Sequence, residues 1–220
     1  MLIQTKELSI KHHSHSPLLS FPDLTITPHD RILLLGESGS GKTTLLSSLA
    51  GFLKPTSGQV FVDNKDIYEL STKSRDALRG KTFGFVFQTL HLIPSLTLSQ
   101  NIMLAADMSG MPCSIDRLNH LLSSLGLHAK AHHKPSSLSQ GEQQRAALAR
   151  AVFNSPTVII ADEPTSSLDD KNADNVMNIL EEQAKESNCA LLVATHDYRI
   201  KHRFQNIISL QLTHTQQATS

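Results

Sequence analysis

The chain has 220 residues, which is enough for one large domain with a buried core. Hydrophobic residues make up 39% and charged residues 18%, a composition that excludes a disordered polyelectrolyte and a membrane channel. Lys plus Arg and Asp plus Glu each number 20, so no general attraction to nucleic acid is expected and we predict no nucleic-acid partner. The absence of a long apolar run or secretory signal, with only two cysteines, predicts a cytoplasmic protein whose membrane role comes through a partner.

Short apolar runs alternate with amphipathic helical patterns along most of the chain. Continuous apolar strands between helices are typical of a buried parallel sheet, so the predicted fold class is α/β. The expected strands are Leu2–Ile10, Leu18–Ile26, Arg31–Leu35, Gln59–Val62, Thr82–Phe87, Thr157–Ala161, Ala190–Ala194 and Asn206–Leu212. The expected helices are Lys42–Gly51, Ser99–Gly110, Ser114–Leu125, Gln140–Asn154 and Asp170–Ser187. The middle differs, because about Ser99 to Lys134 is helical throughout, and we interpret it as an inserted helical subdomain.

A glycine-rich loop follows the strand Arg31–Leu35 and opens the next helix. Glycines let successive backbone N–H groups turn toward phosphate oxygens, and the helix N-terminus adds positive partial charge. Lys42 is expected to reach the β- and γ-phosphates, Thr43 to ligate Mg²⁺ and Thr44 to bond the α-phosphate. A chance Gly/Ser-rich turn is the weaker alternative. The loop matches G-x-x-x-x-G-K-[ST] in full, as Gly36-Glu37-Ser38-Gly39-Ser40-Gly41-Lys42-Thr43.

Two adjacent acids, Asp162 and Glu163, end the apolar strand Thr157–Ala161. The carboxyl ends of parallel strands are where ligands bind in such sheets. Asp162 is predicted to hold Mg²⁺, and Glu163 to orient and polarise a water against the γ-phosphate as general base. The alternative, a helix N-cap before Pro164, explains one acid but not two.

Ser139 followed by Glu142 forms a capping-box pattern at the start of a helix. The same stretch, LSQGEQQR at Leu138–Arg145, is similar to the LSGGQ signature and following QQR of ABC transporter nucleotide-binding subunits, and nearly the whole chain resembles these subunits. The further elements that carry the resemblance are the phosphate loop, Phe85–Gln88, Ile159–Thr165 (IIADEPT), Ser166–Asp169 and Ala194–Asp197 (ATHD), in the family's order.

The resemblance implies a single ABC ATPase domain over residues 1–220, with a P-loop NTPase core. Its sheet would be mostly parallel with an antiparallel N-terminal β part, and a helical subdomain at about 89–152 would be inserted in a RecA-like core of 1–88 and 153–220. It also implies a homodimer on ATP binding that traps two ATP molecules, and an integral membrane permease subunit as partner, which would hold the chain on the inner face of the membrane.

The resemblance assigns residue roles that spacing alone does not. Ser139 and the Gly141 backbone would donate to a γ-phosphate bound by the opposite chain, and Asp169 would cross the dimer interface. Gln88 would touch Mg²⁺ and the attacking water. His196 would bond the γ-phosphate and hold Glu163 in place.

Some positions depart from the family pattern. Gln140 replaces the first signature glycine and Glu142 the final glutamine, which leaves the ATPase rate open. The aromatic residue that stacks on adenine is missing, and His12 or His13 occupies its stretch. With His15 these histidines could form a metal site, but a solvated loop is the stronger interpretation.

The segment Phe83–Gln88 and the residues up to Ile102 resemble the short ATPases of lipoprotein release and macrolide export. Energising such a permease is the predicted function, with export or extraction of a lipid-linked substrate. The alternatives are a regulatory ABC ATPase that controls a membrane complex, and a P-loop kinase, which the signature helix and switch histidine disfavour. Four residues are expected either to line a groove for a permease helix or to belong to the core: Leu90, Leu92, Ile93 and Leu96.

Overall fold

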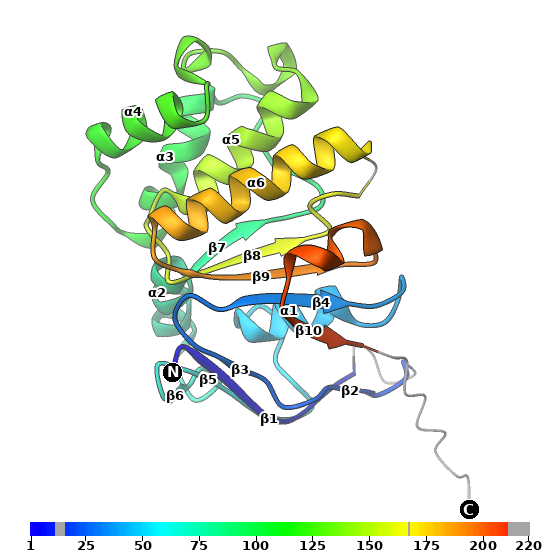
Figure 1. Ribbon diagram of the computed structural model, residues 1–220. Coiled ribbons are helices and arrows are strands. Elements are labelled where there is room, and N and C mark those ends of the chain that lie inside the picture. The colour runs from blue at the N-terminus through cyan, green and yellow to red at the C-terminus, as the bar shows by residue number, and fades with distance from the viewer. Residues whose placement is uncertain (12–15, 167, 211–220) are drawn as a thin grey trace, which may run out of the picture.

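The computed structural model describes residues 1–11, 16–166 and 168–210, and these contain two five-stranded sheets. One sheet is parallel, with the strand order β10-β4-β9-β8-β7 (Figure 1). The predicted α/β class is confirmed. The parallel strands are β4 (Arg31–Leu35), β7 (Phe83–Val86), β8 (Val158–Asp162), β9 (Ala190–Thr195) and β10 (Asn206–Ser209).

The second sheet is antiparallel and is built around β1, as expected for the N-terminal part. β1 pairs with β2, β3 and β5, and β5 pairs with β6. Its strands are β1 (Ile3–Ile10), β2 (Leu19–Ser20), β3 (Thr25–Ile26), β5 (Ser57–Val62) and β6 (Lys65–Asp66).

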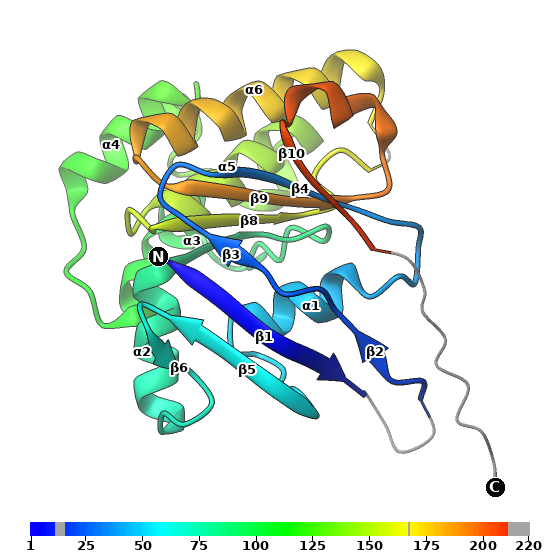
Figure 2. The same cartoon turned by 60° about the horizontal axis from the view of Figure 1, so that its bottom comes forward.

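The helices divide between the two faces of the parallel sheet. Helices α5 and α6 pack on one face, with α3 against α5 and α4 against α3, while α1 lies between the two sheets (Figures 1 and 2). The helices are α1 (Lys42–Leu49), α2 (Thr72–Thr82), α3 (Leu98–Ser109), α4 (Ile115–Ser124), α5 (Gln140–Val152) and α6 (Asp170–Glu186). Short 3₁₀ turns are η1 (His128–Lys130), η2 (Pro135–Ser137) and η3 (Tyr198–Arg203).

The apolar strands explain this layering, because successive side chains of a strand point to opposite faces. In β4, Leu33 and Leu35 join the cluster that contains α3 to α6, while Ile32 and Leu34 join the cluster that contains α1 and the antiparallel sheet. A strand buried on both faces reads as a continuous apolar run, and this is the pattern seen in the sequence.

The structure differs from the expected elements in two places. The predicted strand Leu18–Ile26 is interrupted, and only β2 and β3 pair with β1; Pro22, between them, has no backbone N–H to donate. Helix α2 was not predicted, because its sequence has no apolar stripe and Thr82 is its only buried residue. Within the described residues no helix is both long and apolar enough to cross a membrane.

Candidate functional site

The predicted residues of the glycine-rich loop, with Gln88, Glu163 and His196, converge at the carboxyl ends of four parallel strands. The glycine-rich loop follows β4, Gln88 follows β7, Glu163 follows β8 and His196 follows β9. Together they border a cavity of about 590 Å³. The residues that line it are Ser16, Pro17, Leu19, Ser38, Gly39, Gly41, Lys42, Thr43, Thr44, Gln88, Glu163 and His196.

The glycine-rich loop has the backbone that its sequence predicts. Gly39 and Gly41 have φ angles of 85° and 91°, in the left-handed region that favours glycine. A Cβ on Gly41 would lie 3.0 Å from a Leu19 methyl carbon, and one on Gly36 would lie 2.5 Å from the Ser40 hydroxyl. At Gly36 and Gly41 a larger residue would therefore collide with the side chains of Ser40 and Leu19.

Lys42 is the cation of this cavity, and only 5% of its side chain is exposed. Its ammonium donates hydrogen bonds to the carbonyl oxygens of Gly36, at 2.7 Å, and Glu37, at 3.1 Å. It also lies 3.3 Å from Oε1 of Glu163. The charge is thus held at the mouth of the loop, where phosphate oxygens would accept the same hydrogen bonds.

Thr43 and Asp162 form a polar pair at the start of α1. The Thr43 hydroxyl donates to Asp162 Oδ2 at 2.8 Å. Asp162 is 8% exposed, and its Oδ1 is buried without a hydrogen-bond partner among the described residues. Burial raises the pKa of Asp162 above its usual value. A buried carboxylate oxygen without a partner, beside a hydroxyl, is a donor set that fits a hard divalent cation such as Mg²⁺.

Glu163 has partners on both of its carboxylate oxygens. Oε1 lies 2.9 Å from Nδ1 of His196, and Oε2 accepts from the Thr195 hydroxyl at 2.8 Å. Burial acts to raise the pKa of Glu163, but hydrogen bonds from His196 and Thr195 and the charge of Lys42 together lower it below the usual value. Glu163 also has a φ angle of 50°, a strained value for a residue with a side chain. It is therefore held ionised and oriented, as a general base must be.

The signature residues lie outside this cavity. Ser139 is the N-cap of α5, and its hydroxyl accepts from the Glu142 amide, while the Glu142 carboxylate accepts from the Ser139 amide at 2.7 Å. The predicted capping box is confirmed, and it turns the Glu142 carboxylate back toward its own helix. Ser139 and Gly141 are exposed.

Asp169 is also exposed, and it caps α6 by accepting from the Asn172 amide at 2.8 Å. The capping role follows from its place before a helix, but the predicted contact across a dimer interface involves a second chain. His12, His13 and His15 lie outside the described residues.

Sequence reasoning missed two parts of the site. Thr195 orients Glu163, and an apolar residue followed by Thr at the end of a strand gave no signal of that contact. Ser16, Pro17 and Leu19 line the cavity next to the glycine-rich loop, in the part of the chain where the family resemblance implies an adenine-stacking aromatic residue.

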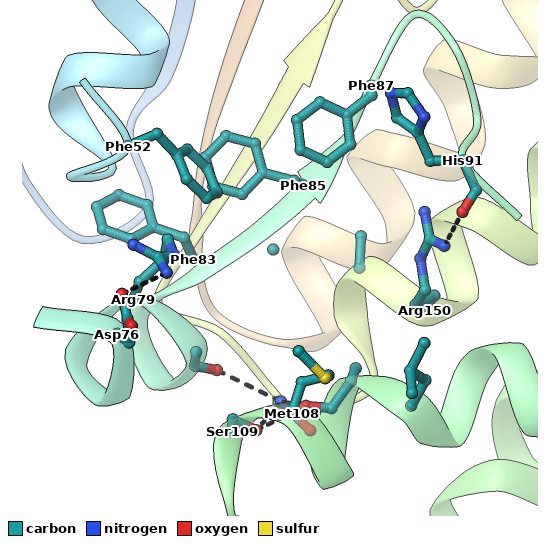
Figure 3. A pocket seen from close by; sticks show the side chains of 16 residues that line it. Phe52, Asp76, Arg79, Phe83, Phe85, Phe87, His91, Met108, Ser109 and Arg150 are labelled. Atoms are coloured by element: carbon teal, nitrogen blue, oxygen red, sulfur yellow. Dashed lines mark hydrogen bonds and ion pairs between the residues drawn. The ribbon is translucent and has the colours of Figure 1, made fainter. Parts of the chain in front are cut away.

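A second cavity, of about 530 Å³, lies among α2, α3, α5 and β7 (Figure 3). Neighbouring rings form a row along its wall: Phe52 to Phe85 at 5.3 Å, Phe85 to Phe87 at 5.2 Å, and Phe87 to His91 at 5.4 Å. Met108 is 80% exposed at its edge. None of the four leucine and isoleucine residues expected to border a groove is among its described lining residues.

Comparisons with known proteins place the chain in one family. The sequence profile described as "ABC transporter" matches residues 19–166. The lipoprotein-releasing system ATP-binding protein LolD of Legionella pneumophila (strain Lens) is 38% identical over 215 residues, covering 96% of this chain and 95% of the relative. The LolD protein of Xanthomonas campestris pv. campestris (strain 8004) is 39% identical over 197 residues, covering 89% of this chain and 82% of the relative.

Solved structures agree with the sequence relatives. The post-hydrolysis dimer of the ATP-binding cassette MJ0796 with ADP and Pi has a TM-score of 0.84 at 32% identity, covering 96% of this chain and 94% of that one. The cassette cbiO1 of Clostridium perfringens, part of the ABC transporter complex cbiONQ, has a TM-score of 0.84 at 29% identity, covering 96% of this chain and 84% of that one. The chain belongs to the ABC transporter family, as an ATP-binding and ATP-hydrolysing subunit.

Proposed function

We propose that this chain energises an integral membrane permease that releases or exports lipoproteins or other lipid-linked substrates. The name of the LolD relatives, which align over nearly the whole chain, supports the substrate class. The subunit would sit on the inner face of the cytoplasmic membrane, held there by the permease rather than by a helix of its own.

ATP hydrolysis at the first cavity starts with Lys42 exchanging its carbonyl partners for phosphate oxygens. Thr43, Asp162 and Gln88 would hold Mg²⁺, which neutralises charge on the β- and γ-phosphates when bound. Glu163 takes a proton from the attacking water while the water oxygen bonds to the γ-phosphorus. The bond between the γ-phosphorus and the β-phosphate oxygen breaks, which gives ADP and inorganic phosphate. His196 holds Glu163 and donates to the γ-phosphate.

Two copies would pair head to tail on ATP. The exposed N-terminal end of α5, with Ser139 and Gly141, supports this part of the proposal, because a helix N-terminus with free N–H groups binds anions such as a γ-phosphate. Exposed Asp169 would lie in the same interface. The MJ0796 relative is dimeric, which supports the pairing.

The second cavity is where we place the permease. A hollow with a row of aromatic rings and an exposed methionine suits the apolar face of a partner helix. The cavity lies between β7 and the helices α3 and α5, so we infer that residues 89–152 act as a helical subdomain that a docked permease moves against the core of 1–88 and 153–220.

The observation that carries this function is the meeting of Lys42, Glu163 and His196 in one cavity. The test is phosphate release from Mg-ATP by the wild type and by the Glu163→Gln variant. Loss of the base is expected to lower kcat by about 10²- to 10⁴-fold with ATP binding retained. Glu69→Gln, at an exposed glutamate that does not line the cavity, is the matched control and should leave kcat unchanged. Equal phosphate release by wild type and Glu163→Gln would exclude Glu163 as the base.

A further inference from the structure

Arg150 lies on α5, the helix that begins at Ser139, and its side chain borders the second cavity (Figure 3). Its guanidinium donates to two consecutive backbone carbonyl oxygens, those of Leu90 and His91, both at 2.7 Å. These carbonyls belong to the segment that follows Gln88. One side chain therefore connects the signature helix to the chain that leaves the nucleotide cavity.

The contact is specific to a guanidinium. Within the described residues Arg150 has no carboxylate at ion-pair distance, and its guanidinium bonds only to backbone carbonyls there. Burial lowers the pKa of Arg150, yet its ordinary value is so high that it stays charged at neutral pH. A planar fork can reach two neighbouring carbonyls at once, which a lysine ammonium on its flexible stem does less well.

A second anchor holds the same segment a few residues later. Asn101 on α3 is fully buried, accepts from the Ile93 amide at 2.7 Å, and donates to the carbonyls of Ile93, Leu96 and Thr97. The chain from Leu90 onward is thus fastened to α3 and α5. The chain up to Val86 is instead paired in the parallel sheet.

Gln88 lies between these two attachments. It lines the nucleotide cavity, and it also lines a small hollow shared with Gln140 and Gln144 of α5. Its position relative to the phosphates therefore depends on how the following residues are held. Arg150 supplies the nearer of the two anchors.

We propose that Arg150 is a positioning residue that clamps residues 90–91 to α5, so that the segment after Gln88 moves with α5 and with the α3 and α5 side of the second cavity, and thereby sets the position of Gln88. The inference rests on the proposed function, because it assumes that Gln88 acts on Mg²⁺ and water and that the second cavity receives the permease. Releasing the clamp leaves ATP binding to the glycine-rich loop intact but displaces Gln88 during the chemical step.

The test compares the full-length wild type with Arg150→Ala, Arg150→Lys and Arg117→Ala. Arg117 is the matched control, because its guanidinium also donates to a backbone carbonyl, that of Val152 at the end of α5, without touching residues 88–97. The measurements are kcat and KM for Mg-ATP, thermal unfolding, and amide hydrogen exchange of the peptide that spans residues 88–97.

Arg150→Ala should lower kcat by about tenfold to a hundredfold with KM within twofold, which is the scale of a displaced catalytic group. Arg150→Lys should recover part of that loss, and Arg117→Ala should leave kcat within twofold of the wild type. Exchange in residues 88–97 should be faster in Arg150→Ala than in the wild type or Arg117→Ala.

Three results would overturn the clamp: unchanged kcat in Arg150→Ala, an equal loss in Arg117→Ala, or unchanged exchange in residues 88–97. If Arg150→Ala does not fold, Arg150→Lys decides the question. Wild-type kcat and wild-type exchange in Arg150→Lys would refute a role for the guanidinium of Arg150. The exchange measurement needs no ATP turnover. An inactive wild type would therefore refute the proposed function while leaving the clamp to be judged by exchange alone.

Discussion

Replacing Asp162 by asparagine separates what this carboxylate does to folding stability from what it does for nucleotide binding. The folded state raises the pKa of Asp162, chiefly through burial, and Glu163 raises it further. The folded protein therefore binds the proton more tightly than the unfolded chain does, and stability falls as the pH rises from the unfolded pKa through the folded one. At neutral pH the ionised carboxylate lowers the free energy of unfolding of the nucleotide-free protein.

The hydrogen bonds of the site set the size of the effect. The asparagine oxygen can still accept from the Thr43 hydroxyl, and its amide takes the place of Oδ1, which has no partner among the described residues. A buried unpaired neutral group costs about 1–3 kcal/mol and a charged one more. Asp162→Asn should therefore stabilise the nucleotide-free protein by about 1 kcal/mol, which raises the melting temperature of a chain this long by roughly 2–4 °C.

With Mg-ATP present, the wild type should have the higher melting temperature of the two proteins. A ligand at a hundred times its Kd adds about 2.7 kcal/mol to the stability of the protein that binds it. For the wild type this corresponds to a melting temperature roughly 5–10 °C higher. Asp162→Asn lacks the metal-binding carboxylate and should gain little.

Thermal unfolding with and without Mg-ATP at neutral pH measures both effects, and a series at lower pH tests the cause. The advantage of the nucleotide-free variant should shrink as Asp162 becomes protonated in the wild type. A variant that melts below the wild type without nucleotide would refute the destabilising carboxylate. An equal gain from Mg-ATP in both proteins would refute Asp162 as a metal ligand.

Three further predictions test other parts of the structure. Ser139→Ala removes the N-cap of α5 and should lower the free energy of unfolding by about 1 kcal/mol in urea titrations and also weaken ATP-dependent dimerisation in size-exclusion chromatography. Ser114→Ala, which removes the cap of α4, should lower the free energy of unfolding without weakening dimerisation. The hydrogen bonds from Arg199 hold the pKa of Asp197 at about 2, so its stabilising effect is lost only as the pH falls from the unfolded value toward 2. Arg199→Ala should raise that pKa, and acid unfolding followed by circular dichroism should begin at a higher pH. Ile160→Ala, at a fully buried residue of β8 whose side chain joins the core cluster that contains α1, should lower the free energy of unfolding in urea by about 2–5 kcal/mol.

The nucleotide cavity could be predicted from the sequence because each of its motifs is a short, continuous stretch of the chain. Glu163 and His196 stand directly after short apolar strands, Lys42 stands at the end of the loop that follows another, and parallel strands bring their carboxyl ends to one edge. The family resemblance then assigned a role to each of these motifs. The roles given to Ser139 and Asp169 stay predictions, because they involve a second chain.

The second cavity and its arginine could not be predicted in the same way. Phe52 and Phe85 meet only through tertiary packing, and helix α2, which borders them, has no apolar periodicity. Arg150 reads as an ordinary polar position on a helix, and its two carbonyl partners lie 59 and 60 residues away in sequence. Contacts between a side chain and a distant backbone carbonyl leave no trace in residue type or spacing.

The bonds of Lys42 to the Gly36 and Glu37 carbonyls bear on how the protein distinguishes among anions. An incoming anion must replace the hydrogen bonds that Lys42 makes to these carbonyls. Its binding free energy therefore includes only the difference between the new hydrogen bonds and the ones replaced. A weakly charged or monodentate anion offers Lys42 little improvement over two neutral oxygens and a nearby carboxylate. A nucleotide with several adjacent phosphate charges offers much more, so hydrogen bonds of this kind favour a polyphosphate over a singly charged anion.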